Sequence, residues 1–151
     1  MPRKVLSVFT PQGLEASASY ITKWLGELYN KLGSVEDWKE VDGSSGEPSF
    51  ENSWTNIGGN YETAAFYKDP FGRVHLRGTI SSGGSGLRAF TLPTQYRPND
   101  ILVFAVVNGA NVDRITIDSN GYVTPLGSGQ YSLDGISFRA EADANAVYYI
   151  R

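Results

Sequence analysis

The sequence has no cysteine, and it has one histidine and one methionine among 151 residues. The lack of cysteine excludes a disulfide framework and thiol chemistry, so stability has to come from apolar burial or from assembly. A single histidine excludes the usual His-rich metal sites and most catalytic triads. The sequence therefore predicts a protein without a cofactor or metal site that is not an enzyme.

Long apolar runs are also missing. Residues 1–9 hold a short, interrupted apolar stretch before Pro11, which fits neither a signal peptide nor a membrane anchor. No Asn-x-Ser/Thr glycosylation sequon is present. We expect a protein that is made in a cytoplasm without a signal peptide, does not insert into a membrane, and leaves the cell, if it does, by a route such as lysis.

Positive charge is scarce in most of the chain. The formal net charge is -3; residues 1–33 carry four Lys/Arg and two Asp/Glu, whereas residues 34–151 carry nine and fourteen. This acidic balance disfavours nucleic acid as a partner. The length, the 40% apolar content and the 17 glycines indicate one globular domain with many turns and short strands.

A helix is predicted within residues 1–33. Thr10 can cap it, Pro11 fits its first turn, and Gly33 is a stop signal. Six apolar residues recur inside it at alternating spacings of four and three residues, the heptad pattern of a coiled coil: Leu14, Ala18, Ile21, Leu25, Leu28 and Leu32. They form the predicted oligomerisation seam, which does not by itself separate a trimer from other oligomers. An amphipathic helix that packs on its own domain is the alternative.

Residues 34–49 are predicted as a connector, with a brief strand-like anchor at Trp38 and Val41, and residues 50–151 as a mostly β domain. Asp69-Pro70-Phe71-Gly72 has the residue order of a type I turn, and Asn120-Gly121 is a hairpin signal. Strands are predicted near residues 50–57, 64–68, 73–81, 88–92, 101–107, 112–118, 122–126, 130–139 and 147–150. Their number and spacing predict an antiparallel β-sandwich or jelly roll behind the N-terminal helix.

The strand predicted at 73–81 alternates strictly in polarity. Val74, Leu76 and Ile80 share its apolar face, and its polar face carries Arg73, His75, Arg77 and Thr79. The cations would stand about 7 Å apart, because a strand rises about 3.3 Å per residue. Such a row suits phosphate or carboxylate groups along a cell-wall polymer. The alternative is pairing with carboxylates across the sheet or on an adjacent chain.

Three aromatic residues and a neighbouring cation are further candidate ligand contacts, because aromatic rings near turns stack on sugar rings: Trp54, Tyr61, Tyr96 and Arg97. For each of them, packing in the core or at a corner is the alternative.

Asp42, Asp69, Asp100 and Asp134 lie in turn contexts, where the carboxylate stabilises the turn. A pair of glycosidase carboxylates among them would not be visible in the sequence. The Gly-rich stretch 81–86 lacks the Gly-Lys-Ser/Thr ending of a phosphate-binding loop and indicates a flexible loop between strands.

The order of these motifs resembles the C-terminal β-sandwich module of bacteriophage tail fibres and receptor-binding proteins. The likeness covers roughly residues 50–140. It rests on an aromatic strand and a turn followed by V-x-L-x-G-x-I, a Gly-rich loop, F-x-L-P-x-x-Y-R-P, a strand ending in N-G and S-L-D-G-I-S-F. The resemblance implies a virion component, usually a homotrimer, that contacts the host surface or another virion protein.

The favoured hypothesis is a homotrimeric phage tail or baseplate protein that binds a host-surface saccharide or cell-wall polymer and contacts other virion proteins through its N-terminal segment. The alternatives are a structural virion protein without a receptor, such as a head fibre, decoration or assembly protein, and a cellular carbohydrate-binding module. Such a module is usually an appendage of a longer chain. This chain begins at Met and needs one domain plus a helix, so we favour the virion protein and expect it to be located in the virion.

Overall fold

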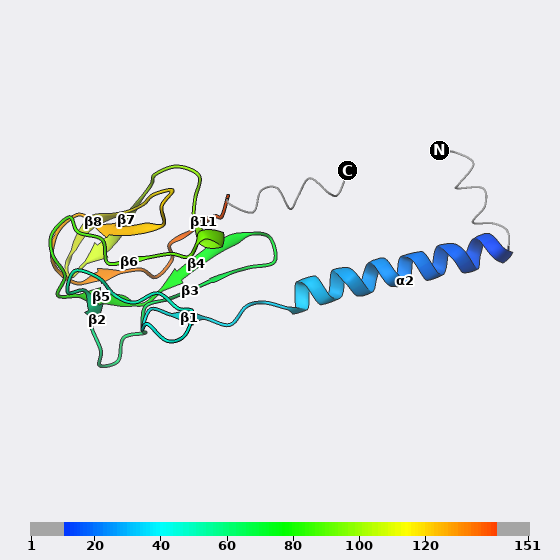
Figure 1. The fold of residues 1–151 in the computed structure, drawn as a ribbon, viewed down its shortest axis with the longest axis horizontal. Helices are drawn as coiled ribbons and strands as arrows, with labels where there is room; N and C mark the ends of the chain where they lie inside the picture. Colours follow the sequence, from blue (N-terminus) through cyan, green and yellow to red (C-terminus); the bar gives the residue numbers. More distant parts are fainter. Residues whose placement is uncertain (1–10, 142–151) are drawn as a thin grey trace. The chain divides into compact units, whose positions relative to one another are not determined.

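The computed structural model describes the backbone of residues 11–141 and the side chains of residues 17–141. The chain divides into two compact units, of which one ends at Val35 and the other begins at Glu36. Figure 1 shows the helix of the first unit and the strands of the second. The strand predicted at 147–150, the N-terminal segment predicted to contact other virion proteins, and the Thr10 cap all lie outside the described residues.

Helix α2 (Pro11–Gly33) has the extent that its start and stop signals predict. Its last turn is closed by Ser34, whose N–H donates to the carbonyl oxygen of Asn30 at 3.1 Å and whose hydroxyl donates to that of Lys31 at 3.3 Å. The Lys31 ammonium also favours this end of the helix, where the helix dipole is negative.

The second unit consists of two antiparallel sheets. One has four strands in the order β1 (Lys39–Glu40), β3 (Ala65–Lys68), β4 (Arg73–Arg77) and β11 (Ser137–Arg139). The other has seven, in the order β2 (Thr55–Asn56), β5 (Thr79–Ser81), β10 (Tyr131–Ser132), β7 (Leu102–Asn108), β8 (Asn111–Ile117), β9 (Tyr122–Pro125) and β6 (Phe90–Thr91). A short 3-10 helix, η2 (Thr94–Tyr96), follows β6. The predicted fold class is confirmed.

One apolar core lies between the two sheets. The four-stranded sheet contributes Phe66, Val74 and Phe138, and the seven-stranded sheet contributes residues such as Ile115 and Tyr131. Both sheets thus bury one face of their alternating strands, as expected for a sandwich. Strand β1 lies within the segment predicted as a connector and pairs with β3, so residues 36–49 belong to the sandwich unit.

Two hairpin turns share one design, and both were predicted. The turns between β3 and β4 and between β8 and β9 begin with Asp69 and Asp118 and end with Gly72 and Gly121. Each glycine has a positive φ, 85° and 82°, which a residue with a side chain adopts only with strain. One carboxylate oxygen of each aspartate accepts two backbone N–H groups, at 2.9 and 3.0 Å.

Two predicted strands, 73–81 and 130–139, are each divided between the two sheets, which the sequence did not indicate. The first crosses at Gly78, where φ is 99° and a Cβ would lie 2.4 Å from the carbonyl oxygen of Thr63. The second crosses beside it, and the Oδ1 of Asp134 accepts the Gly78 N–H at 2.8 Å. The alternation in the sequence hides these breaks, because the apolar residues on both sides of each crossing face the same core.

Candidate functional site

The predicted row of cations lies on the outward face of the four-stranded sheet. Along β4 the pattern of burial alternates, with Val74 buried between Arg73 and His75, and Arg77 partly exposed at the end. The predicted alternation is therefore confirmed for β4. It is wrong for Thr79, which is 7% exposed, because the chain has crossed into the other sheet at that point.

His75 is held by the turn that precedes its strand. Its Nε2 lies 2.9 Å from Oδ2 of Asp69, whose Oδ1 accepts the N–H groups of Phe71 and Arg73. Burial acts to raise the pKa of Asp69, but the hydrogen bonds from His75 and the two N–H groups outweigh it and hold this pKa below its ordinary value. The Tyr67 ring stacks on the imidazole, with centroids 4.9 Å apart. His75 is thus fixed by two neighbours.

Arg77 is fixed in a similar way. Its Nη2 lies 2.8 Å from Oε1 of Glu40, and its Nη1 lies 3.6 Å from Oε2 of Glu62. The guanidinium stands 4.6 Å from the centroid of the Trp38 ring, which packs edge-on against Tyr67. Two of the three side chains of the row, His75 and Arg77, therefore pair with carboxylates of their own chain, which is the alternative that the sequence left open.

Arg73 contacts a hydroxyl, because its Nη2 donates to Oγ of Ser137 at 2.9 Å. The aromatic residues of this face, Trp38 and Tyr67, were missed as site residues. The register of the hairpin places Tyr67 opposite His75, so the turn sequence contained that signal. Trp38 precedes β1, whose pairing with β3 is not encoded by any nearby turn.

Trp54 and Tyr96 are core residues, 1% and 2% exposed, so the prediction that they contact a ligand needs correction. The indole Nε1 of Trp54 donates to the carbonyl oxygen of Leu87 at 3.1 Å. The Tyr96 hydroxyl donates to the Glu36 carboxylate at 2.8 Å. Both polar groups are satisfied inside the protein, and the rings are not accessible to a sugar.

Arg97 and Tyr61 differ in their surroundings. The Nε of Arg97 donates to the carbonyl oxygen of Leu92 at 2.8 Å and lies where a side chain at position 121 would otherwise stand, so Arg97 braces the loop after β6. Tyr61 is 59% exposed. Of the predicted aromatic contacts, Tyr61 is the one that a ligand can reach.

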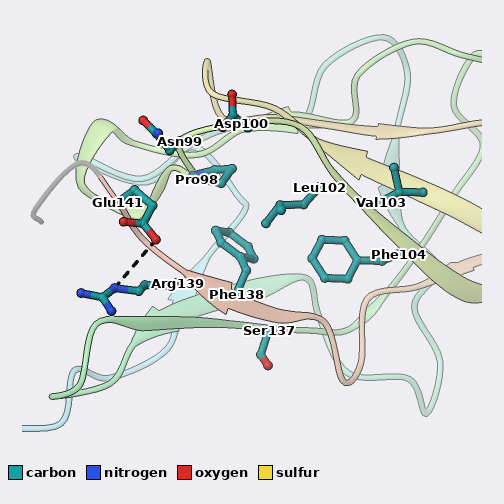
Figure 2. A pocket seen from close by; sticks show the side chains of 10 residues that line it. All are labelled: Pro98, Asn99, Asp100, Leu102, Val103, Phe104, Ser137, Phe138, Arg139 and Glu141. Carbon is teal, nitrogen blue, oxygen red and sulfur yellow. Dashed lines mark ion pairs between the residues drawn. The ribbon is translucent and has the colours of Figure 1, made fainter.

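A pocket of about 630 Å³ lies beside the start of β7 and along β11, where side chains from both sheets meet. Its apolar part is formed by Leu102, Phe104 and Phe138, and the centroids of the two Phe rings are 6.2 Å apart. The polar residues of the lining are Asn99, Asp100, Ser137, Arg139 and Glu141, and in Figure 2 the side chains of Asn99 and Asp100 extend away from the two rings. The volume is that of a typical small-molecule site. Its residues come from distant segments of the chain, so no sequence motif predicted the pocket.

Other carboxylates serve local structure. Oδ1 of Asp42 accepts the N–H and the hydroxyl of Ser44, as the turn context predicts. Among the side chains of residues 17–141, no group of three or more His, Asp or Glu is arranged to hold a metal ion. No helix in the described part of the chain combines the length and the apolarity that crossing a bilayer requires.

The predicted oligomerisation seam presents apolar side chains to solvent. Ile21, Leu25, Leu28 and Leu32 are between 38% and 52% exposed, and Ala18 is also exposed. Leu14 belongs to α2, but its side chain lies outside the described residues. The flanking Trp24 and Tyr29 are 54% and 76% exposed and widen the stripe. The helix therefore carries a continuous apolar stripe.

No protein-family model matches the chain, and no curated protein matches its sequence. The fold is similar to the crystal structure of the receptor binding protein (gp15) of Listeria phage PSA, with a TM-score of 0.62 over 85% of this chain and 79% of that chain. The sequence identity is 17%, so the likeness is one of fold. The predicted resemblance to phage receptor-binding proteins is thus confirmed for the fold.

Proposed function

We propose that this protein is a phage virion component that attaches the particle to its host, and that it works as a homotrimer. The observation that carries the proposal is the fold similarity to a phage receptor binding protein, which extends over most of both chains. The order of turn and strand motifs in residues 50–140 supports the same class independently.

The helix supports the trimer. Its seam has Leu or Ala at one heptad position and Leu or Ile at the other, which disfavours a simple dimer. Burial of each leucine contributes about 1.5–3 kcal/mol, and three chains that share the seam would bury it around one axis. The homotrimeric state common among phage receptor-binding proteins selects three chains.

A second apolar surface also favours self-association. On the outward face of β7 and β8, Val107 and Val112 are 54% and 77% exposed and pair directly with each other. Arg114 stands among them, opposite Ala105. An apolar patch around one arginine has the composition of a protein interface. We place this patch between the chains of the trimer.

The proposed ligand is a saccharide of the host surface. On the four-stranded sheet, rings and polar groups hold one another in place, and the His75 imidazole and the Arg77 guanidinium each face carboxylates of the same chain. Such a surface offers ring faces to C–H groups and fixed polar groups to hydroxyls. It favours a neutral glycan over the anionic polymer that the row alone suggested.

Labelled protein incubated with a panel of bacterial strains would test the attachment function. We expect saturable binding to some strains, competed by unlabelled protein and by surface glycan purified from a bound strain. Protein unfolded by heat is the control. A folded, trimeric protein that binds no strain of a broad panel would favour the structural virion role instead.

A further inference from the structure

We propose that the pocket beside β7 and β11 is a receptor subsite separate from the outward face of the four-stranded sheet, and that it takes one uncharged sugar residue of a host-surface glycan. This inference rests on the proposed attachment function and names the ligand class and the residues that hold it. The pocket combines a concave apolar surface with polar groups around it, which is the composition of small-molecule sites.

The apolar side of the pocket suits the C–H face of a sugar ring. Phe104 is half-buried on β7 and offers the accessible ring, whereas Phe138 of β11 is 4% exposed and supports it from the other sheet, with the two rings tilted by 45°. Leu102 completes this side. The aromatic pair spans the two sheets, so the packing of the sandwich itself holds the rings in place.

The polar groups suit hydroxyls, which both donate and accept hydrogen bonds. Asp100 and Glu141 offer acceptors, Arg139 offers donors, and the Asn99 amide offers both. The Nε of Arg139 lies 3.8 Å from Oε1 of Glu141, and both side chains are more than a third exposed, so this ion pair is weak and open to rearrangement. A ligand hydroxyl can take its place.

The charge of the pocket selects against anions. Two carboxylates, Asp100 and Glu141, stand against one guanidinium, that of Arg139. A phosphate or a uronic acid would meet a net negative charge, whereas a neutral sugar would not. Binding to the pocket is therefore expected to change little with salt, unlike binding of an anionic polymer to the cations of β4.

The test compares pocket variants with a matched loop variant in the full chain. Asn99→Ala with Asp100→Ala removes two exposed polar groups, and Phe104→Leu replaces a ring with an aliphatic side chain of similar bulk. Ser128→Ala with Gln130→Ala makes comparable changes in an exposed loop at the opposite end of β7, outside the pocket lining. Melting temperature and mass in solution are measured for each variant to show that fold and assembly are intact.

Two readouts are used: binding to a receptive strain at low and high salt, and saturation-transfer NMR with the methyl glycosides of glucose, galactose, rhamnose and N-acetylglucosamine. We expect both pocket variants to lose at least tenfold in cell affinity, the loop variant to bind like the wild type, and one or more glycosides to give a signal that the pocket variants lose. Cell binding should be nearly the same at both salt concentrations.

The outcomes separate the two proposals. Cell binding that survives in both pocket variants, or that falls with salt and is lost on Arg73→Ala, overturns the pocket and leaves the attachment function in place. If the wild type binds no strain, the glycoside signal decides, because a signal lost in the pocket variants still supports the subsite. Absence of both signals overturns the pocket as well as the attachment function.

Discussion

Helix α2 and the sandwich differ in how far their large apolar side chains are exposed to solvent. Ile21 and Leu25 on the helix are 52% and 50% exposed, whereas Phe66 and Ile80 in the sandwich are fully buried. A single helix of this length gains little stability by itself in water, because nucleation is costly and no apolar surface is removed from solvent. The sandwich encloses its own core. The comparison teaches that the sandwich buries its large apolar side chains within itself, whereas the helix carries an apolar stripe that the proposed trimer would bury.

The largest expected effect is on the helix. Leu25→Lys with Leu28→Lys removes two buried leucines from each proposed trimer chain, at about 1.5–3 kcal/mol per leucine, and places like charges at the axis. Light scattering should show single chains, while the melting transition of the sandwich remains. Ser19→Lys with Asn30→Lys adds the same charge on the other side of the helix and should stay trimeric. A trimeric seam variant would show that the sandwich holds the assembly alone.

The next effect concerns the sandwich alone. Gly78→Ala forces a side chain into the left-handed region, at a cost of about 1–3 kcal/mol, and also drives its Cβ into the backbone of Thr63. The free energy of unfolding should fall by more than the strain alone. Gly135 has a φ of 86° with open space around it, so Gly135→Ala measures the strain without the overlap. Denaturant titrations of the two variants measure the difference. An equal loss of unfolding free energy in both would contradict the close approach of the backbone at Gly78 to Thr63.

A smaller difference is expected within β4. Arg77→Ala removes two ion pairs and the contact with Trp38, which together are worth roughly 1–2 kcal/mol at a partly exposed site. Arg73→Ala removes one exposed hydrogen bond to Ser137 and should stay within about 0.5 kcal/mol of the wild type. Thermal melts of the two variants make the comparison. Equal losses would mean that the ion pairs do not stabilise the sheet.

The smallest effect depends on pH. The pKa of Asp69 in the folded state lies below its ordinary value of 3.8, so the carboxylate stabilises the sandwich above that pH and this stability is lost as pH falls through the folded pKa. Asp69→Asn should therefore lower the free energy of unfolding at pH 7 by an amount on the order of 0.5 kcal/mol. The difference in melting temperature between variant and wild type should narrow below about pH 4. Asp118→Asn removes the same two backbone hydrogen bonds from a turn of the same design, so its loss at pH 7 measures their part without the contact to His75. A gap that persists unchanged at pH 3 would contradict this role.

Local signals predicted much of the fold. Pro11 and Gly33 mark the ends of α2, and the turns that end at Gly72 and Gly121 set two hairpins. The alternation around Val74 gave the faces of β4 correctly. Each of these features depends on residues within a few positions of one another, which is why a single sequence is sufficient to predict them.

The remainder depends on contacts between distant segments. Trp54 was expected near a turn surface, but it packs where a Cβ on Gly83 would lie 1.9 Å from its indole, so the glycine of a predicted flexible loop makes room for a core ring. The pairing of Arg77 with Glu40 requires β1 to join the sheet. The pocket requires Phe104 and Phe138 to meet across the two sheets. Such long-range contacts leave no pattern among neighbouring residues in the sequence.

The mass of the full chain in solution tests the contrast between the two units most directly. The chain has a mass of 16.5 kDa. Static light scattering at micromolar concentration should give about three times that mass if the stripe on α2 is buried between chains. A mass of one chain, with the helix intact by circular dichroism, would contradict the account, because the helix would then be stable without a second chain.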